Sequence, residues 1–194
     1  MQFLNNKSIK NLYMIACISF IISINLHVNA QSQKIDSLEK MLLQHSKEDT
    51  TKVNLLNDIA WALYTKNIEK SLEYANQAKE IAEKIDYQAG KAVSINLNGV
   101  YYYIKGNYPE SLDYFQKSMK LHKESGNKIG VASCLNNIGV IHQISGNFEE
   151  SLQSFQESLE IKKEIGDETG IPSSLNNIGT VYMDLGKLNL AKEY

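Results

Sequence analysis

LNNIG (135–139) recurs at residues 175–179, 40 residues further along the chain, and it is the centre of a longer match. The segment GVASCLNNIGVIHQISGNFEESLQSFQESLEIKKEIGDET (130–169) aligns without gaps with the residues that precede and follow it. A regular period of this length indicates stacked copies of one structural unit. Glycines recur in register at three places of the unit: at 90, 130 and 170; at 99, 139 and 179; and at 106, 146 and 186.

Each unit has the apolar pattern of two helices. In the unit 130–169, Leu135 and Ile138 belong to the first apolar stripe, and Leu152 and Phe155 belong to the second. Spacings of three and four residues are typical of a helix face, whereas a strand alternates. The segment SGNFEE separates the two stripes, and its glycine and asparagine are residues that end one helix and cap the next. The pattern predicts an all-α fold of repeated helical hairpins.

A weaker, earlier copy precedes these units. The segment LNDIAWALYTKNIEKSLEYANQA (56–78) aligns with the later units if one turn residue is missing near Lys66. Ala60 then takes the place of Gly99. The chain therefore has three units that align without gaps and one divergent unit at the start.

Gly139 and its counterparts lie in the middle of the first predicted helix of each unit. A glycine there costs about 1 kcal/mol relative to alanine. Close approach of the facing helix offsets such a cost, because a side chain would not fit. Ser111 and Ser151 of the second helices are the expected small partners.

These features resemble the tetratricopeptide repeat. That family has Leu-Gly and Tyr in its first helix and Ala, Phe and Ala in its second. The period of 40 residues exceeds the usual period of about 34, which implies longer helices or a longer connection between repeats. The resemblance covers about residues 50–194 and implies a right-handed superhelical solenoid of antiparallel helix pairs. The matching positions are Leu135, Ile138-Gly139, Ser151, Phe155 and Ser158 in one unit, and Leu175, Ile178-Gly179, Tyr182 and Ala191 in the next.

The sequence makes a separate prediction for each end of the array. Residues 31–48 contain an apolar stripe at Ile35, Leu38 and Leu42, which predicts a capping helix, because exposed array ends need covering. A loose, partly helical leader is the alternative. The last unit stops early in its second helix, so we expect the sequence to be a fragment of a longer protein. The repeats span about 50–89, 90–129, 130–169 and 170–194, the last of them incomplete.

Residues 1–30 have the pattern of a signal peptide. Lys7 and Lys10 precede an apolar run at 12–24, and Val28 and Ala30 have the small-residue spacing of a cleavage site. The run is shorter than the roughly 20 residues that a membrane span needs. We therefore expect an exported bacterial protein of the periplasm or cell envelope with a mature N-terminus at Gln31. An uncleaved N-terminal membrane anchor is the alternative.

Composition and motifs argue against several classes of function. The formal net charge is −2, and all 20 basic residues are lysines. Because arginine is the usual bidentate partner of phosphate and guanine, this composition argues against nucleic-acid recognition by this region. The four histidines are scattered without metal-ligand spacing, and no phosphate-binding loop or nucleophile motif is present. We expect no enzymatic activity, no metal site and no cofactor.

In the tetratricopeptide family, the first helices line the concave surface. The resemblance therefore implies a groove formed by the side of each first helix that lies opposite its packing stripe. One asparagine recurs on that side in all four units, and aromatic residues accompany it in the first two units. The candidate groove residues are Asn57, Trp61, Tyr64, Asn96, Tyr103, Asn136, Gln143 and Asn176.

Two interpretations of this asparagine column stay open. A row of carboxamides can bond an extended peptide backbone, with Tyr and Trp beside it as anchors. Alternatively, the asparagines bond helix ends and neighbouring repeats. For the second asparagine of each pair, Asn137 and Asn177, the structural interpretation is favoured, because Asn is usual there in the family. The groove columns contain no lysine, so we expect no carboxylate clamp, a mode that some family members use for C-terminal peptides.

The sequence thus predicts a protein–protein interaction module or scaffold that holds a peptide or partner protein in its concave groove. The alternative is the sensory or regulatory repeat region of a larger bacterial signal-transduction protein. A structural adaptor of the cell envelope is a third hypothesis.

Overall fold

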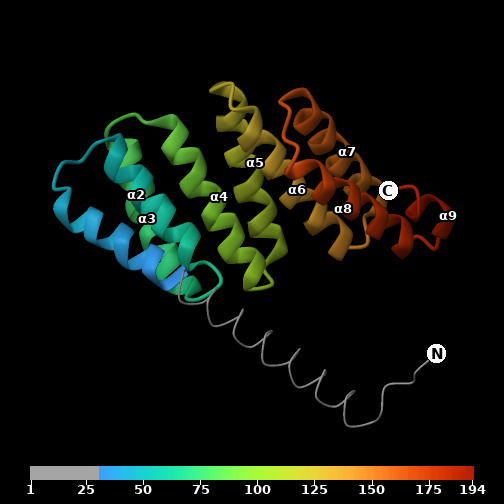
Figure 1. Cartoon of the computed structure of the whole chain (residues 1–194), viewed down its shortest axis with the longest axis horizontal. Helices are drawn as coiled ribbons and strands as arrows, with labels where there is room; N and C mark the ends of the chain where they lie inside the picture. Colours follow the sequence, from blue (N-terminus) through green and yellow to red (C-terminus); the bar gives the residue numbers. More distant parts are fainter. Residues whose placement is uncertain (1–30) are drawn as a thin grey trace, which may run out of the picture.

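The computed structural model describes residues 31–194, and within that range it contains helices and turns but no strands. After a helical stretch at residues 31–44, successive helices run side by side in a row, with antiparallel neighbours joined by short turns (Figure 1). Each helix packs mainly on the helices next to it in sequence. The prediction of an all-α solenoid of helix pairs is therefore confirmed. The elements are α2 (Thr50–Leu63), α3 (Ile68–Lys84), α4 (Gln88–Ile104), α5 (Tyr108–Glu124), α6 (Lys128–Ile144), α7 (Phe148–Glu164), α8 (Gly170–Asp184) and α9 (Leu188–Ala191).

The long period arises from long helices. Each helix from α3 to α7 has 17 residues, and three-residue turns join these five helices. Gly106 and Gly146 occupy these turns with φ of 75° and 77°, which is the left-handed conformation that ends a helix. In the turn after α3 the same place is held by Asp86, which has φ of 53°. Longer helices, and not longer connections, therefore explain the 40-residue period.

The mid-helix glycines allow close helix packing, but the residue they face differs from the prediction. A Cβ added at Gly99 would lie 2.6 Å from the Phe115 ring, and one added at Gly139 would lie 2.7 Å from the Phe155 ring. The facing group is therefore a phenylalanine and not a small side chain. The predicted serines have another role, because Ser151 Oγ donates a hydrogen bond of 2.8 Å to the carbonyl of Gly139.

The first unit contains the same serine-to-carbonyl hydrogen bond, but the two bonded residues are one residue closer in the sequence. Ser71 Oγ donates to Ala60 O over a separation of 11 residues, whereas Ser111 Oγ donates to Gly99 O over 12 residues. Ala60 thus lies where Gly99 lies in the next unit, as the alignment with one missing turn residue predicts. Ala75 stands where the later units have phenylalanine, so the larger residue at position 60 faces a smaller one.

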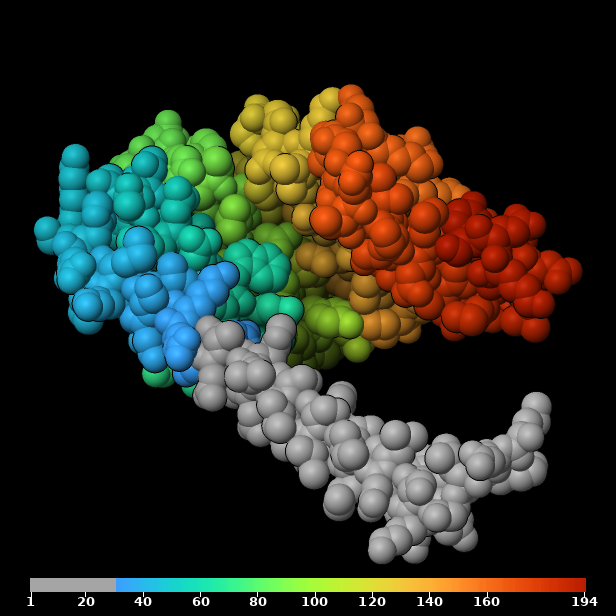
Figure 2. All heavy atoms as spheres, viewed as in Figure 1, coloured from blue at the N-terminus to red at the C-terminus, as the bar shows by residue number. Residues whose placement is uncertain are grey.

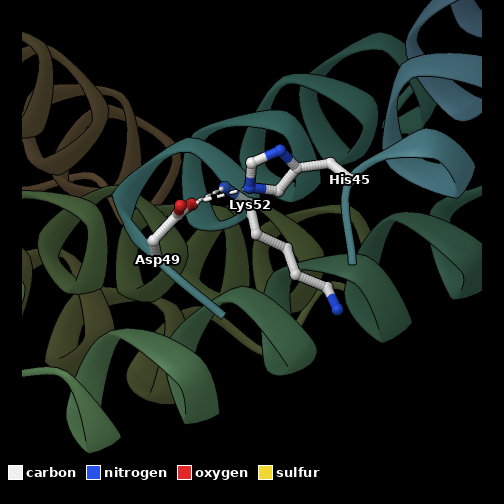
Figure 3. A network of polar contacts seen from close by, with 3 residues as sticks. All are labelled: His45, Asp49 and Lys52. Carbon is white, nitrogen blue, oxygen red and sulfur yellow. Dashed lines mark hydrogen bonds and ion pairs between the residues drawn. The ribbon is translucent and has the colours of Figure 1, made fainter. Parts of the chain in front are cut away.

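The helical residues 31–44 pack on the start of the array. Ile35 is buried in a cluster with Ile59, Ala62 and Leu63, and Leu38 and Leu42 pack against the same cluster. The carboxylate of Asp49 then caps α2, accepting from the backbone N–H of Lys52 at 3.1 Å and from His45 Nε2 at 2.8 Å (Figure 3). The hydrogen bond from His45 lowers the pKa of Asp49. Local capping therefore fixes where the first repeat begins.

The predicted signal peptide at residues 1–30 lies outside the described residues. Between residues 31 and 194, no helix is both long enough and apolar enough to cross a membrane.

Candidate ligand groove

The face formed by the first helices contains an apolar cavity of about 240 Å³. Trp61 and Tyr64 border it from the end of α2, and Phe115 of α5 is buried beside it. In Figure 2 the middle of the molecule, coloured green to brown, lies deeper than the first and last repeats on either side. The remaining lining residues are Val100, Tyr103 and Ile104 of α4 and Asn137 and Val140 of α6.

Large apolar side chains of this cavity remain open to solvent. Trp61 is 40% exposed and Ile104 is 46% exposed. The rings of Trp61 and Tyr64 meet edge to face, with centroids 5.4 Å apart. Contiguous exposed apolar groups bordered by polar residues are typical of a binding surface. Rigid aromatic side chains also supply apolar contact area at low entropic cost.

A polar cavity of about 220 Å³ adjoins the apolar one, and the two share Trp61 and Asn137. Asparagine, serine and lysine side chains supply most of its wall. The lining residues, with Trp61 included, come from five helices, so the curvature of the array brings them together. Besides the two shared residues, the lining consists of Asn96, Ser133, Asn136, Lys162 and Ser173.

The asparagine column divides into two kinds of position. Asn57 is 3% exposed; its Nδ2 donates to Gly90 O at 3.0 Å, and its Oδ1 accepts from Ser94 Oγ at 2.9 Å. Asn96 is also buried and donates to Cys134 Sγ at 3.2 Å. These two amides join neighbouring repeats, which is the structural interpretation of the column.

Asn136 and Asn176 are more accessible. Asn136 is half-buried, and its Oδ1 accepts from Asn177 Nδ2 at 2.8 Å. Asn176 is exposed and lines a separate cavity on α8 with Thr180 and Met183. Asn136 and Asn176 therefore face space that a ligand can enter. Asn57 and Asn96 are buried and are scarcely accessible to a ligand.

The other candidate residues lie as follows. Trp61, Tyr64 and Tyr103 all line the apolar cavity. Gln143 lines neither cavity; its Nε2 donates to Asp184 Oδ2 at 2.6 Å and so connects α6 with α8. The structure thus brings the three aromatic residues together and gives Gln143 a bridging role between repeats.

Two groove residues differ from the sequence-based expectation. Asn137, which we expected to be purely structural, lines both cavities, whereas Asn177 does bridge two repeats. A lysine from outside the predicted groove columns, Lys162 of α7, also lines the polar cavity. The predicted columns consist of first-helix residues, whereas Lys162 belongs to a second helix.

Lys162 is 9% exposed and has only neutral hydrogen-bond partners. Its Nζ donates to Ser174 Oγ at 2.8 Å and to Gly170 O at 3.3 Å. Burial lowers the pKa of the ammonium, and the charge of Asp167 partly opposes this effect. Across residues 31–194, no carboxylate lies within 4 Å of the Nζ atom. The cation thus has unused bonding capacity beside the polar cavity.

The free cysteine of the described region, Cys134, is buried. Burial raises the pKa of the Cys134 thiol, whose Sγ donates to Ser118 Oγ at 3.4 Å. A raised pKa keeps the group as a thiol, which is a poor nucleophile. No three His, Cys, Asp or Glu side chains of the described residues are placed to hold a metal ion.

Comparison with known proteins identifies two matching family models. Both are described as tetratricopeptide repeat; one matches residues 91–164 and the other matches residues 172–194. A comparison with curated protein sequences finds no match.

Solved structures resemble this fold at low sequence identity. Aspartyl phosphate phosphatase F from Bacillus subtilis has a TM-score of 0.74 at 19% identity, covering 85% of this chain and 46% of that one. A Rap protein complexed with competence and sporulation factor has a TM-score of 0.77 at 18% identity, covering 88% and 49%. NprR in complex with its cognate peptide NprX has a TM-score of 0.71 at 20% identity, covering 84% and 48%. The chain therefore spans about half the length of each of these three proteins.

Proposed function

The chain belongs to the tetratricopeptide repeat family, and on that premise we propose that it binds a peptide, or an extended segment of a partner protein, in its groove. The observation that carries the proposal is the pair of adjoining cavities. The apolar one offers Trp61, Tyr64 and Tyr103 to a side chain, and the polar one offers Asn136 and other donors to a backbone. Apolar anchors beside a few convergent polar groups are the usual composition of a specific binding site.

The proposed role is binding without catalysis, with a protein or peptide partner and not a nucleic acid. The net charge of −2 supplies no field that would attract phosphate chains. Membrane association would arise from the N-terminal segment or from sequence beyond residue 194, and not from the groove.

A regulatory role is the second candidate function. Two of the similar structures contain a bound factor or peptide, which favours a peptide ligand here too. In a solenoid, a ligand that bridges several repeats favours one curvature of the array over others. Occupancy of the groove would then be transmitted to a partner or to another part of a longer signal-transduction protein.

Export is part of the proposal and rests on the composition of residues 1–30. Cleavage after Ala30 would give a mature chain that starts at Gln31 and retains the helical residues 31–44. Mass spectrometry of the exported protein tests this; residues before Gln31 in the mature form would contradict it.

Trp61 makes binding measurable, because it is the only tryptophan of the chain and it borders the apolar cavity. A synthetic library of tryptophan-free hexapeptides is titrated into the full chain while the Trp61 emission is recorded. We expect a subset of peptides with apolar side chains to shift the emission saturably. If no peptide does so, the proposed function fails.

Two matched variants locate the site. Ile104→Lys places a charge at the rim of the apolar cavity, and Ile129→Lys makes the same change at a residue that is 66% exposed and borders neither groove cavity. Peptide affinity should fall at least about tenfold in the first variant and stay unchanged in the second, because a charged group opposes apolar contact. Equal loss in both variants would place binding elsewhere.

A further inference from the structure

The first residues of the described chain lie beside the groove. Gln31 Nε2 donates a hydrogen bond of 3.2 Å to the carbonyl of Ala62, near the end of α2. Ile35, one helical turn later, is buried in a cluster that includes Ala62. Trp61, the sequence neighbour of Ala62, borders both groove cavities. Residues 1–30 are therefore attached to the array at a point next to the groove.

The attached segment contains an apolar run close to this point. The run LYMIACISFIISI (12–24) has no charged residue, and only residues 25–30 separate it from Gln31. An extended chain covers about 3.5 Å per residue, so the end of the run lies at most about 25 Å from Gln31. A ligand joined to its site by a short linker acts at an effective concentration on the order of 1 mM. A second copy of the chain offers the same run only at its bulk concentration, so the attached run is the favoured occupant.

The groove offers this run a matching apolar surface. Trp61 and Ile104 border the apolar cavity and are partly open to solvent. Ile144 ends α6 at the place where Ile104 ends α4, and it is 48% exposed. Exposed apolar side chains therefore recur from the cavity along the ends of two consecutive first helices. Covering such surface is favourable by about 25 cal/mol per Å² of apolar area removed from water.

We propose that, in a chain that retains residues 1–30, the apolar run 12–24 occupies the groove beside Trp61 and competes with the peptide ligand. The inference rests on the proposed function and deepens it by naming how the site is regulated. An effective concentration of about 1 mM and a dissociation constant of about 0.1 mM for the run reduce peptide affinity roughly tenfold. The full chain therefore still binds peptides, but more weakly than a chain without this segment.

The first test needs no peptide and measures how far Trp61 is covered. Acrylamide quenching of the Trp61 emission is compared between the full chain and its variant Phe20→Asp/Ile21→Asp, in which two charges interrupt the run. Quenching should be at least about twofold more efficient in the variant, because burying a charge in an apolar cavity is costly. Equal quenching in the two chains would overturn the proposal, whether or not peptides bind.

Two controls separate this contact from other effects of the segment. Asn5→Asp/Asn6→Asp adds the same charges before the run and should leave quenching as in the unmodified chain. An increase as large as that of Phe20→Asp/Ile21→Asp would contradict docking of the run. Quenching of the unmodified chain should also be independent of its concentration, because the contact lies within one chain. Loss of protection on dilution would assign the contact to a second copy and overturn the proposal.

Groove variants locate the docking site of the run. In a chain that carries Ile104→Lys, the change Phe20→Asp/Ile21→Asp should alter quenching little, because a charge at the cavity rim already opposes docking. In a chain that carries Ile129→Lys, the same change should have its full effect, because Ile129 borders neither groove cavity. An undiminished effect in the Ile104→Lys chain would place the run elsewhere and contradict the proposal.

The last test measures competition directly. The peptides that shift Trp61 emission in the full chain are titrated into Phe20→Asp/Ile21→Asp and into Asn5→Asp/Asn6→Asp. Affinity should rise about tenfold in the first variant and stay unchanged in the second. If peptides bind all three chains equally, the proposed regulation fails while the proposed function stands. If no peptide binds any of them, the proposed function fails, and the quenching result still decides whether the run docks.

Discussion

Gly139 and Gly179 hold the same place in consecutive repeats but have different neighbours. A Cβ at Gly139 would lie 2.7 Å from the Phe155 ring, whereas one at Gly179 would have Ala191 O as its nearest atom, at 3.4 Å. Gly139→Ala should destabilise the fold by about 1–2 kcal/mol, because overpacking costs more than the gain of about 1 kcal/mol in helix propensity. Urea denaturation, followed by circular dichroism, measures the change in the free energy of unfolding.

Gly179→Ala is the control for this change. Its added methyl group has ordinary contacts, so the helix-propensity gain should leave the stability equal or slightly higher. Similar destabilisation by both alanines would mean that the Phe155 contact is not the reason for the glycine.

His122 connects stability to pH. It is buried, its Nδ1 has no hydrogen-bond partner, and burial lowers its pKa below the ordinary value of 6.5. The folded state therefore prefers the neutral ring, and the unfolded state binds more protons as the pH falls. The free energy of unfolding should decrease below about pH 6.5, down to the lower pKa of the folded state.

The variant His122→Ala isolates this contribution, since the first unit has Ala82 at the equivalent position. Its absolute stability should fall because a cavity forms, but the free energy of unfolding should depend less on pH between about 6.5 and 5. An identical pH dependence in both proteins would exclude His122 as its source.

At the scale of the helices, local sequence determines most of what the structure contains. The spacing of Leu135 and Ile138 predicts a helix, and Gly146 with Asn147 predicts its end, because these signals act within one turn of the backbone. The same reasoning predicts a close approach at Gly139. It does not identify Phe155 as the facing group, because the residue that meets a glycine depends on how the two helices cross.

The groove was less predictable than the helices. Trp61, Tyr64 and Tyr103 follow from the side of the helix on which they lie. Lys162 and Asn137 do not, because their access to the cavities depends on the curvature that stacked repeats produce together. The position of Lys162 relative to Gly170 and Ser174 would have been a usable signal, since the repeat alignment shows a lysine where the earlier units have Ala82 and His122.

At the scale of the whole molecule, each helix pair contacts mainly its neighbours, so a perturbation should stay near its origin. Ile35 joins the helical residues 31–44 to α2 through Ile59 and Leu63. Ile35→Ala should cost about 2–4 kcal/mol locally, because it leaves a cavity in that cluster. Hydrogen exchange should then become faster in α2 and α3 while remaining unchanged in α7.

Leu43→Ala is the matched control, because Leu43 lies in the same helix but is 87% exposed, so its loss leaves no cavity. Hydrogen exchange in that variant should equal that of the unmodified chain throughout.

If Ile35→Ala accelerates exchange equally in α2 and α7, the array unfolds as one cooperative unit. A ligand bound at α2 would in that case stabilise the last repeat as strongly as the first. If the effect stays in α2 and α3, only a ligand that spans the groove from Trp61 to the α6–α8 junction can couple the two ends.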